Sequence, residues 1–145
     1  MNTTIRTMTA ADKENVLEMM RIFYHSPAVY TDGSEEIFRK DFETCVSGSP
    51  YLEGYILEDG HTIQGYAMIA KSFSTEFGKP CIWIEDIYLK EPYRGCGIAG
   101  QFFRFIQEKH PHCLFRLEVE EENTGAVRSY EKNGFTVLPY MEMKK

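Results

Sequence analysis

One segment, residues 84–106, limits the possible folds of this sequence more than any other. It passes from a β-rich stretch, IEDIYL, through a loop, KEPYRGCG, into an amphipathic helical stretch, IAGQFFRFI. A turn between a strand and a helix directs unpaired backbone N–H groups and the positive end of the helix at one point. Because glycine reaches positive φ and allows close approach to the backbone, the segment predicts a site for phosphate or pyrophosphate.

The rest of the chain predicts a mixed α/β fold. Apolar residues recur at helical spacing in some segments, and β-branched and aromatic residues cluster in others. The expected order is β-α-α-β-β-β-α-β-α-β in a single domain, residues 1–145. We expect helices over residues 10–25, 34–48, 98–110 and 123–134, and strands over residues 3–8, 51–73 (a hairpin turning at Asp59–Gly60), 81–89, 113–120 and 135–144.

Composition excludes several classes of protein. The 145 residues are 43% hydrophobic and 26% charged, which is typical of a globular domain. The net charge of −6 argues against a nucleic-acid binder that works by neutralising phosphates. No apolar run approaches the ~20 residues of a membrane helix, and the first residues lack the apolar core of a signal peptide. We therefore expect a cytoplasmic protein without a membrane partner.

The cysteines and histidines predict neither a metal site nor a disulfide framework. Cys45, Cys81, Cys96 and Cys113 are at least 15 residues apart, so no CxxC pair exists. The HPH run ending at His112 could touch a metal, but no third ligand stands at a suitable spacing. We expect no metal in the site.

The glycine loop fits two different patterns. Gly95, Gly97 and Gly100 match the dinucleotide fingerprint GxGxxG, and Glu118 follows 18 residues after Gly100. However, the polar stretch KEPYR separates the strand from the glycines, and only 45 residues follow Gly100. That is too few for the rest of a doubly wound sheet, so the context argues against a nucleotide-dependent oxidoreductase.

The second pattern combines two motifs. YRGCGIA contains Arg94, Gly97 and Ala99 at the spacing Arg-x-x-Gly-x-Ala, and ENTGAVRSYEKNGF follows about 30 residues later. Together they resemble the GNAT superfamily of N-acetyltransferases, nearest in motif to the spermidine/spermine type through Ile84-Glu85-Asp86 and the helix of Tyr130. The resemblance implies the GNAT acyl-CoA N-acyltransferase fold and acetyl-CoA, or coenzyme A, as cosubstrate.

The resemblance also assigns roles. Glu85 matches a general base and Tyr130 a general acid, for direct attack by a primary amine in a ternary complex. A base is needed because an alkylammonium of pKa ~10.4 is not nucleophilic at neutral pH. Cys96 departs from the family, which often has a basic residue there. The residues implied to bind the cosubstrate are Ile87, Tyr88, Leu89, Arg94, Gly95, Cys96, Gly97, Ile98, Ala99, Gly100, Asn123 and Lys132.

The acceptor is predicted from charge. Residues 1–75 carry 11 acids and 6 bases, a net charge of −5, whereas residues 76–145 carry a net charge of −1. Acidic and aromatic groups suit a cation, so we expect a small amine such as a polyamine, bound by Tyr30, Asp32, Glu35 and Asp86. A protein N-terminus or a lysine is the alternative acceptor.

Two further hypotheses stay open at this point. The same fold could serve as a non-catalytic acyl-CoA-binding sensor, which would bind CoA and transfer nothing. Residues 135–143, FTVLPYMEM, are rich in aromatic residues and methionine and could form the seam of a homodimer.

Overall fold

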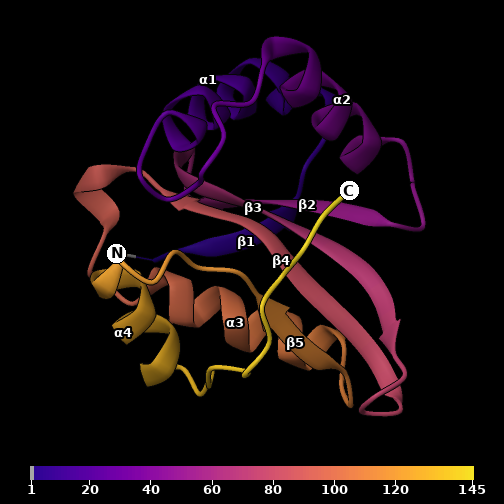
Figure 1. The fold of residues 1–145 in the computed structure, drawn as a ribbon. Coiled ribbons are helices and arrows are strands. Elements are labelled where there is room, and N and C mark those ends of the chain that lie inside the picture. Colours follow the sequence, from indigo (N-terminus) through magenta and orange to yellow (C-terminus); the bar gives the residue numbers. More distant parts are fainter. Residues whose placement is uncertain (1) are drawn as a thin grey trace.

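A computed structural model describes residues 2–145 and contains a five-stranded sheet with helices on both faces (Figure 1). The strand order is β1-β2-β3-β4-β5, and every neighbouring pair is antiparallel except the parallel pair β4–β5. The strands are β1 (Thr4–Thr7), β2 (Leu52–Asp59), β3 (Thr62–Ser74), β4 (Lys79–Leu89) and β5 (Leu114–Leu117). The helices are α1 (Lys13–Tyr24), α2 (Glu35–Val46), α3 (Ile98–Lys109) and α4 (Thr124–Lys132), with 3-10 turns at Ala10–Asp12 and Glu91–Tyr93.

Two of the helices begin at side-chain caps. Ser34 Oγ accepts the backbone N–H of Ile37 at the start of α2, and the Asn123 side chain accepts that of Ala126 at the start of α4. Such caps satisfy backbone donors that have no partner inside the helix. The helix α3 starts differently, at Gly97, which provides no side-chain cap.

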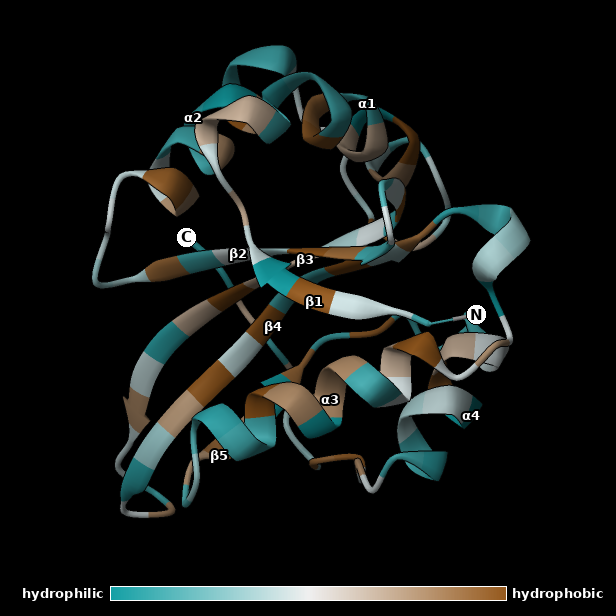
Figure 2. Ribbon diagram, turned by 180° about the vertical axis from the view of Figure 1, so that it is seen from behind, coloured by the Kyte–Doolittle hydropathy of each residue, from teal (hydrophilic) through white to brown (hydrophobic). Residues whose placement is uncertain are grey.

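Each face of the sheet has its own apolar core. Helices α1 and α2 pack on one face with Ile56, Tyr66 and Met68 beneath them, and α3 packs on the other with Leu57 and Ile69 beneath it. In Figure 2 the brown, apolar bands of the helices turn toward the sheet and the teal bands turn away. The predicted mixed α/β class is confirmed, and the doubly wound sheet of the dinucleotide hypothesis is absent from residues 2–145.

A β-bulge interrupts β4. Met68 of β3 pairs with Asp86, but the next residue, Ile69, pairs with Ile84, so Glu85 is an extra residue without a partner on β3. Before the bulge the even-numbered residues Ile82 and Ile84 face the α3 core, whereas after it the odd-numbered Ile87 does. The bulge therefore shifts the alternation of the strand by one residue.

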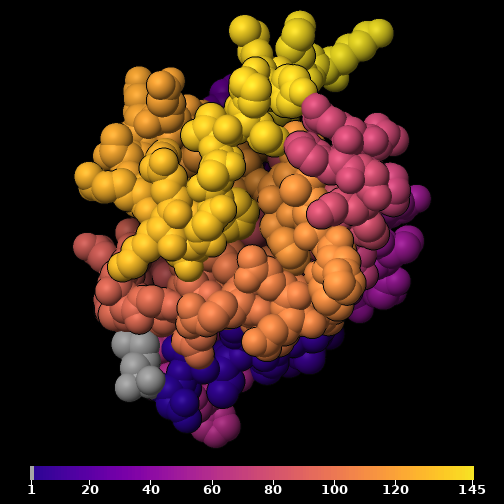
Figure 3. Space-filling view, turned by 90° about the horizontal axis from the view of Figure 1, so that it is seen from below, coloured from indigo at the N-terminus to yellow at the C-terminus, as the bar shows by residue number. Residues whose placement is uncertain are grey.

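The strand predicted over residues 135–144 is wrong. No strand is present in this segment, and Val137, Met141 and Met143 are 83%, 88% and 87% exposed. Pro139 lacks the N–H that a ladder needs, and β5 has only four residues to pair with. Figure 3 shows the segment in yellow on the surface, reaching the β3–β4 hairpin in pink, where the Tyr140 hydroxyl donates to Glu76.

The sequence predicts neither a membrane helix nor a metal site, and the structure can be compared with these predictions only over residues 2–145. No helix in it has the length and apolar character that crossing a bilayer requires. No cluster of His, Cys, Asp and Glu suited to a metal occurs among residues 2–145. The cytoplasmic location stays a prediction.

Candidate active site

The glycine loop leads into an uncapped helix N-terminus, as the sequence predicts. Gly95 and Gly97 have φ of 73° and 82°, in the left-handed region that favours glycine. A Cβ atom placed on either residue would meet no atom within 4 Å, so the space in front of the loop is open. The first backbone N–H groups of α3 point out of this helix end, and such an end favours an anion.

The second half of β4 has an unpaired backbone edge. The parallel pairing with β5 runs from Cys81–Leu114 to Ile84–Leu117 and stops there. From Asp86 onward β4 pairs only with β3, since β5 has already ended. Ile87 and Leu89 lie in this open stretch, where their main-chain groups can bind an extended ligand with amide groups.

Arg94 is fixed at the mouth of the loop. Its Nε donates to the carbonyl oxygen of Leu89 at 2.8 Å, and its guanidinium lies 5.6 Å from the centre of the Tyr88 ring. These two contacts leave the remaining N–H groups of the guanidinium available to a phosphate. The neighbouring Cys96 is exposed, and its thiol lies 3.6 Å from the carbonyl oxygen of Arg94.

Glu85 and Asp86 differ sharply in their surroundings. Asp86 is only 4% exposed, and its two carboxylate oxygens accept the hydroxyl hydrogens of Tyr24 at 2.9 Å and Tyr66 at 2.7 Å. Glu85, the bulged residue, reaches the surface. Partial burial and the neighbouring charges of Asp86 and Glu142 raise the pKa of Glu85.

Carboxylates from four parts of the chain gather around the bulge. We name Asp41 of α2, Glu85 and Asp86 of β4, Glu118 after β5, and Glu142 of the C-terminal segment the bulge carboxylates. Burial, with the charges of Asp86 and Glu85, raises the pKa of Asp41 to about 6. A hydrogen bond with Glu142, together with burial, raises the pKa of Glu118 to about 7. Negative charge is thus concentrated here, and a cation would stabilise it.

Tyr130 lies on α4, beside α3. Its ring packs edge-on against Phe103 and Phe135, with centroid distances of 6.0 and 6.1 Å. Burial raises the pKa of Tyr130, whose hydroxyl is protonated at neutral pH like that of any tyrosine of ordinary pKa ~10. Among residues 2–145, no side chain or carbonyl group accepts that proton. Asn123 caps the same helix and Lys132 is exposed in its last turn.

The predicted acceptor residues are not all brought together. Tyr30 and Asp32 are exposed in the loop between α1 and α2, and the carboxylate of Glu35 is held by Arg21 at 2.7 and 2.8 Å. In the described chain, no hydrogen bond or ion pair joins these three side chains to Glu85 or Asp86. Their role in binding the acceptor stays a prediction.

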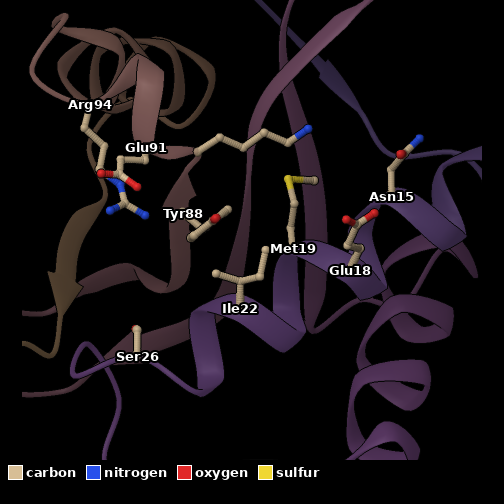
Figure 4. A pocket seen from close by; sticks show the side chains of 9 residues that line it. Asn15, Glu18, Met19, Ile22, Ser26, Tyr88, Glu91 and Arg94 are labelled. Carbon is tan, nitrogen blue, oxygen red and sulfur yellow. The ribbon is translucent and has the colours of Figure 1, made fainter.

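A pocket of about 520 Å³ lies between α1 and the end of β4. Figure 4 shows Arg94, Glu91 and Tyr88 on one side of it and the side chains of α1 on the other. It borders the glycine loop through Arg94 but includes neither Glu85 nor Tyr130. The complete lining is Asn15, Glu18, Met19, Ile22, Ser26, Tyr88, Lys90, Glu91 and Arg94.

The sequence interpretation missed the bulge and the surroundings of Asp86. The bulge does leave a signal, because the apolar alternation changes from even to odd positions between Ile84 and Ile87. The tyrosines that bind Asp86 leave none, since Tyr24 and Tyr66 are 62 and 20 residues away from it. Asp41, Glu118 and Glu142 are likewise brought together only by the fold.

Comparison with known proteins identifies the family. The model of the Acetyltransferase (GNAT) family matches residues 15–135. A curated relative, thialysine N-epsilon-acetyltransferase of Sus scrofa, is 30% identical over 143 residues, which cover 90% of this chain and 82% of that protein. The chain therefore belongs to the GNAT family of acetyltransferases. The expected enzyme class is confirmed, and neither the oxidoreductase nor the sensor hypothesis is needed.

Solved structures agree in fold. AAC(6')-Iy, in complex with the bisubstrate analogue CoA-S-monomethyl-acetylneamine, superposes with a TM-score of 0.82 at 16% identity, covering 100% of this chain and 98% of that one. A possible acetyltransferase from Clostridium difficile 630 gives a TM-score of 0.83 at 18% identity, covering 99% and 96%. At these identities the similarity concerns the fold alone.

Proposed function

We propose that residues 1–145 form one acetyltransferase domain, which moves the acetyl group of acetyl-CoA to the primary amine of a small cation such as a polyamine. The observation that carries the acceptor class is the concentration of negative charge at the bulge carboxylates. The Sus scrofa relative is named for acetylating the ε-nitrogen of thialysine, and this name supports an amine acceptor. A protein N-terminus or lysine remains the alternative.

Glu85 acts as the general base in this proposal. Removing a proton from an alkylammonium of pKa ~10.4 at pH 7 costs about 4.6 kcal/mol, and a positioned base makes that proton loss part of the reaction. Glu85 is the extra residue of the bulge, so no partner on β3 restrains it. The raised pKa of its carboxyl strengthens it as a base while it is ionised.

Tyr130 acts as the general acid and protonates the departing thiolate of CoA. A tyrosine hydroxyl of ordinary pKa ~10 already carries its proton at neutral pH, as a general acid must, and burial raises the pKa of Tyr130 further. The aromatic contacts with Phe103 and Phe135 fix the ring, so that the hydroxyl needs no reordering during the reaction.

The glycine loop binds the cosubstrate. The pyrophosphate of CoA would accept hydrogen bonds from the backbone N–H groups between Gly95 and Ala99, with Arg94 as the charged partner. The open main-chain edge at Ile87 and Leu89 would bind the pantetheine arm. The free space in front of the glycines and the uncapped N-terminus of α3 fit such a ligand.

An acceptor panel tests the proposal. Purified protein is incubated with acetyl-CoA and, separately, with spermidine, thialysine, a lysine-containing basic peptide and an uncharged amine. Released CoA thiol and product mass are measured. We expect turnover with spermidine or thialysine well above that with the uncharged amine. Turnover confined to the uncharged amine would overturn the charge argument, and acetyl-CoA binding without any transfer would revive the sensor hypothesis.

Replacing Gly97 with alanine tests the loop. A side chain at φ 82° adds about 1 kcal/mol of strain and places a Cβ where the ligand approaches. We expect the KM for acetyl-CoA to rise roughly tenfold, the equivalent of about 1.4 kcal/mol.

Gly48→Ala provides the matched control for this change. Gly48 has φ of 77° and follows α2, away from the loop. It should lower the melting temperature to a similar extent and leave the KM for acetyl-CoA unchanged. Equal KM values for the two variants would argue that the loop does not bind the cosubstrate.

We also propose that the chain forms a homodimer through its C-terminal segment. Val137, Met141 and Met143 are exposed there, and in residues 2–145 no strand covers the outer edge of β5. Sedimentation equilibrium should give about twice 16.8 kDa for the full chain. A monomer mass at all concentrations would refute the dimer.

A further inference from the structure

The hydroxyl of Tyr24 joins two parts of the molecule that the sequence keeps far apart. Tyr24 is the last residue of α1, directly before the loop of residues 25–34, and its hydroxyl donates to Asp86, the neighbour of Glu85. One side chain therefore connects the end of a helix with the β-bulge. A hydrogen bond to a buried carboxylate is stronger than a bond between neutral groups.

The ring of Tyr24 also supports the loop between α1 and α2. It packs on Phe38 of α2 with a centroid distance of 5.2 Å. Gly33, near the end of the loop, lies so close to Phe38 that a Cβ atom there would be 2.5 Å from the ring and 3.5 Å from the ring of Tyr24. The loop therefore packs against the rings of Phe38 and Tyr24, and the hydroxyl of Tyr24 extends to the bulge.

Asp86 is held without a cation. Its two oxygens accept from Tyr24 and Tyr66, and no Lys or Arg of the described chain forms an ion pair with it. A buried carboxylate satisfied only by neutral donors is costly, and such groups concentrate at functional sites. Tyr66 fixes this carboxylate from the sheet, while Tyr24 fixes it from the helix that leads into the loop.

We propose that Tyr24, through its hydrogen bond to Asp86, is a positioning residue that couples the α1–α2 loop to the bulge and so sets the place of the acceptor amine relative to Glu85. The inference rests on the proposed function and deepens it. It also gives Asp86 a different role from direct contact with the acceptor, because its carboxylate is buried and already accepts two tyrosine hydroxyls. Tyr66 holds the same carboxylate but does not touch the loop, so its hydroxyl has a smaller effect on the acceptor.

Tyr24→Phe tests the coupling, because it removes the hydroxyl and keeps the ring on Phe38. We expect the KM for the acceptor, spermidine or thialysine, to rise about tenfold in this variant, while the KM for acetyl-CoA stays within twofold of wild type. Tyr55→Phe is the matched control, since the Tyr55 hydroxyl also donates to a carboxylate, that of Glu53, elsewhere in the sheet. It should change the melting temperature and neither KM. An unchanged acceptor KM in Tyr24→Phe overturns the proposal.

Hydrogen exchange gives a readout that needs no acetyl transfer. In Tyr24→Phe the backbone amides of residues 25–34 and those next to Glu85 should both exchange faster than in wild type, whereas in Tyr55→Phe they should not. Faster exchange in the loop alone, or in neither segment, would overturn the coupling. If wild-type protein acetylated no amine and the two segments still loosened together, the coupling would stand and only the proposed function would fall.

Tyr66→Phe keeps the proposal falsifiable if Tyr24→Phe folds poorly. It removes the other hydroxyl that binds Asp86 and leaves the loop contacts intact. We expect the amides next to Glu85 to exchange faster and those of residues 25–34 to exchange faster by a smaller factor, because the Tyr24–Asp86 hydrogen bond still links the two segments. Unchanged exchange in the loop, despite faster exchange next to Glu85, would overturn the coupling.

Discussion

Tyr130→Phe is expected to lower kcat by about 10²-fold or more, which is typical for the loss of a general acid. The departing thiolate then receives no proton from the enzyme. The phenylalanine ring keeps the packing on Phe103 and Phe135, so the melting temperature should change little. Steady-state kinetics with acetyl-CoA and spermidine or thialysine would measure the loss.

Two controls separate chemistry from folding. Tyr55→Phe removes a hydroxyl that is bound to Glu53 and should leave kcat near the wild-type value. Isothermal titration should give the same affinity for CoA in Tyr130→Phe and in wild type. A kcat within threefold of wild type would show that Tyr130 serves only to pack α4 onto α3.

Glu85→Gln is expected to lower kcat by a similar factor, about 10²-fold, and to change the pH profile. In wild type the rate should fall as the pH decreases through the raised pKa of Glu85, because a protonated carboxyl cannot accept the ammonium proton. Burial, together with the charges of Asp86 and Glu142, raises that pKa, so the fall should begin above the ordinary range of a glutamate. Glutamine does not titrate, and the variant should lose this limb.

The other bulge carboxylates complicate the acidic limb and therefore need their own variant. Glu118 has a pKa of about 7 and Asp41 one of about 6, so each could produce a similar fall in rate. Glu118→Gln should keep the acidic limb of Glu85, because burial and the charges of Asp86 and Glu142 raise the pKa of Glu85. Glu43→Gln, an exposed change on α2, should alter neither the acidic limb of the pH profile nor kcat. If Glu85→Gln kept the wild-type limb, Glu85 would not be the base.

Local patterns were enough to predict most of the fold. Ser34 and Asn123 mark helix starts because a short polar side chain caps the backbone wherever the rest of the chain goes. Asp59–Gly60 marks the hairpin for the same reason, since a turn depends only on its own residues. The segment of residues 135–144 has the composition of a strand, but a strand also needs a neighbour, and its sequence says nothing about whether one is available.

The candidate site shows the same contrast: its local features could be predicted from the sequence, and its long-range contacts could not. The positive φ of Gly95 and Gly97 was predicted correctly because it is a property of the loop itself. The partners of Asp86 could not be predicted, because Tyr24 and Tyr66 look like ordinary core aromatics until the fold brings them to the carboxylate. Charge shows the same limit. Residues 1–75 do carry an excess of acid, but one of the charges that raise the pKa of Glu85 is that of Glu142, near the C-terminus.

The bulge in β4 also separates what the fold needs from what the proposed reaction needs. Without Glu85, the residues Ile82, Ile84, Ile87 and Leu89 would alternate regularly, and every side chain of β4 would still face its present core. The sheet could close with a strand one residue shorter. Glu85 is therefore a surplus residue as far as packing is concerned, and selection on folding alone would have no reason to retain it.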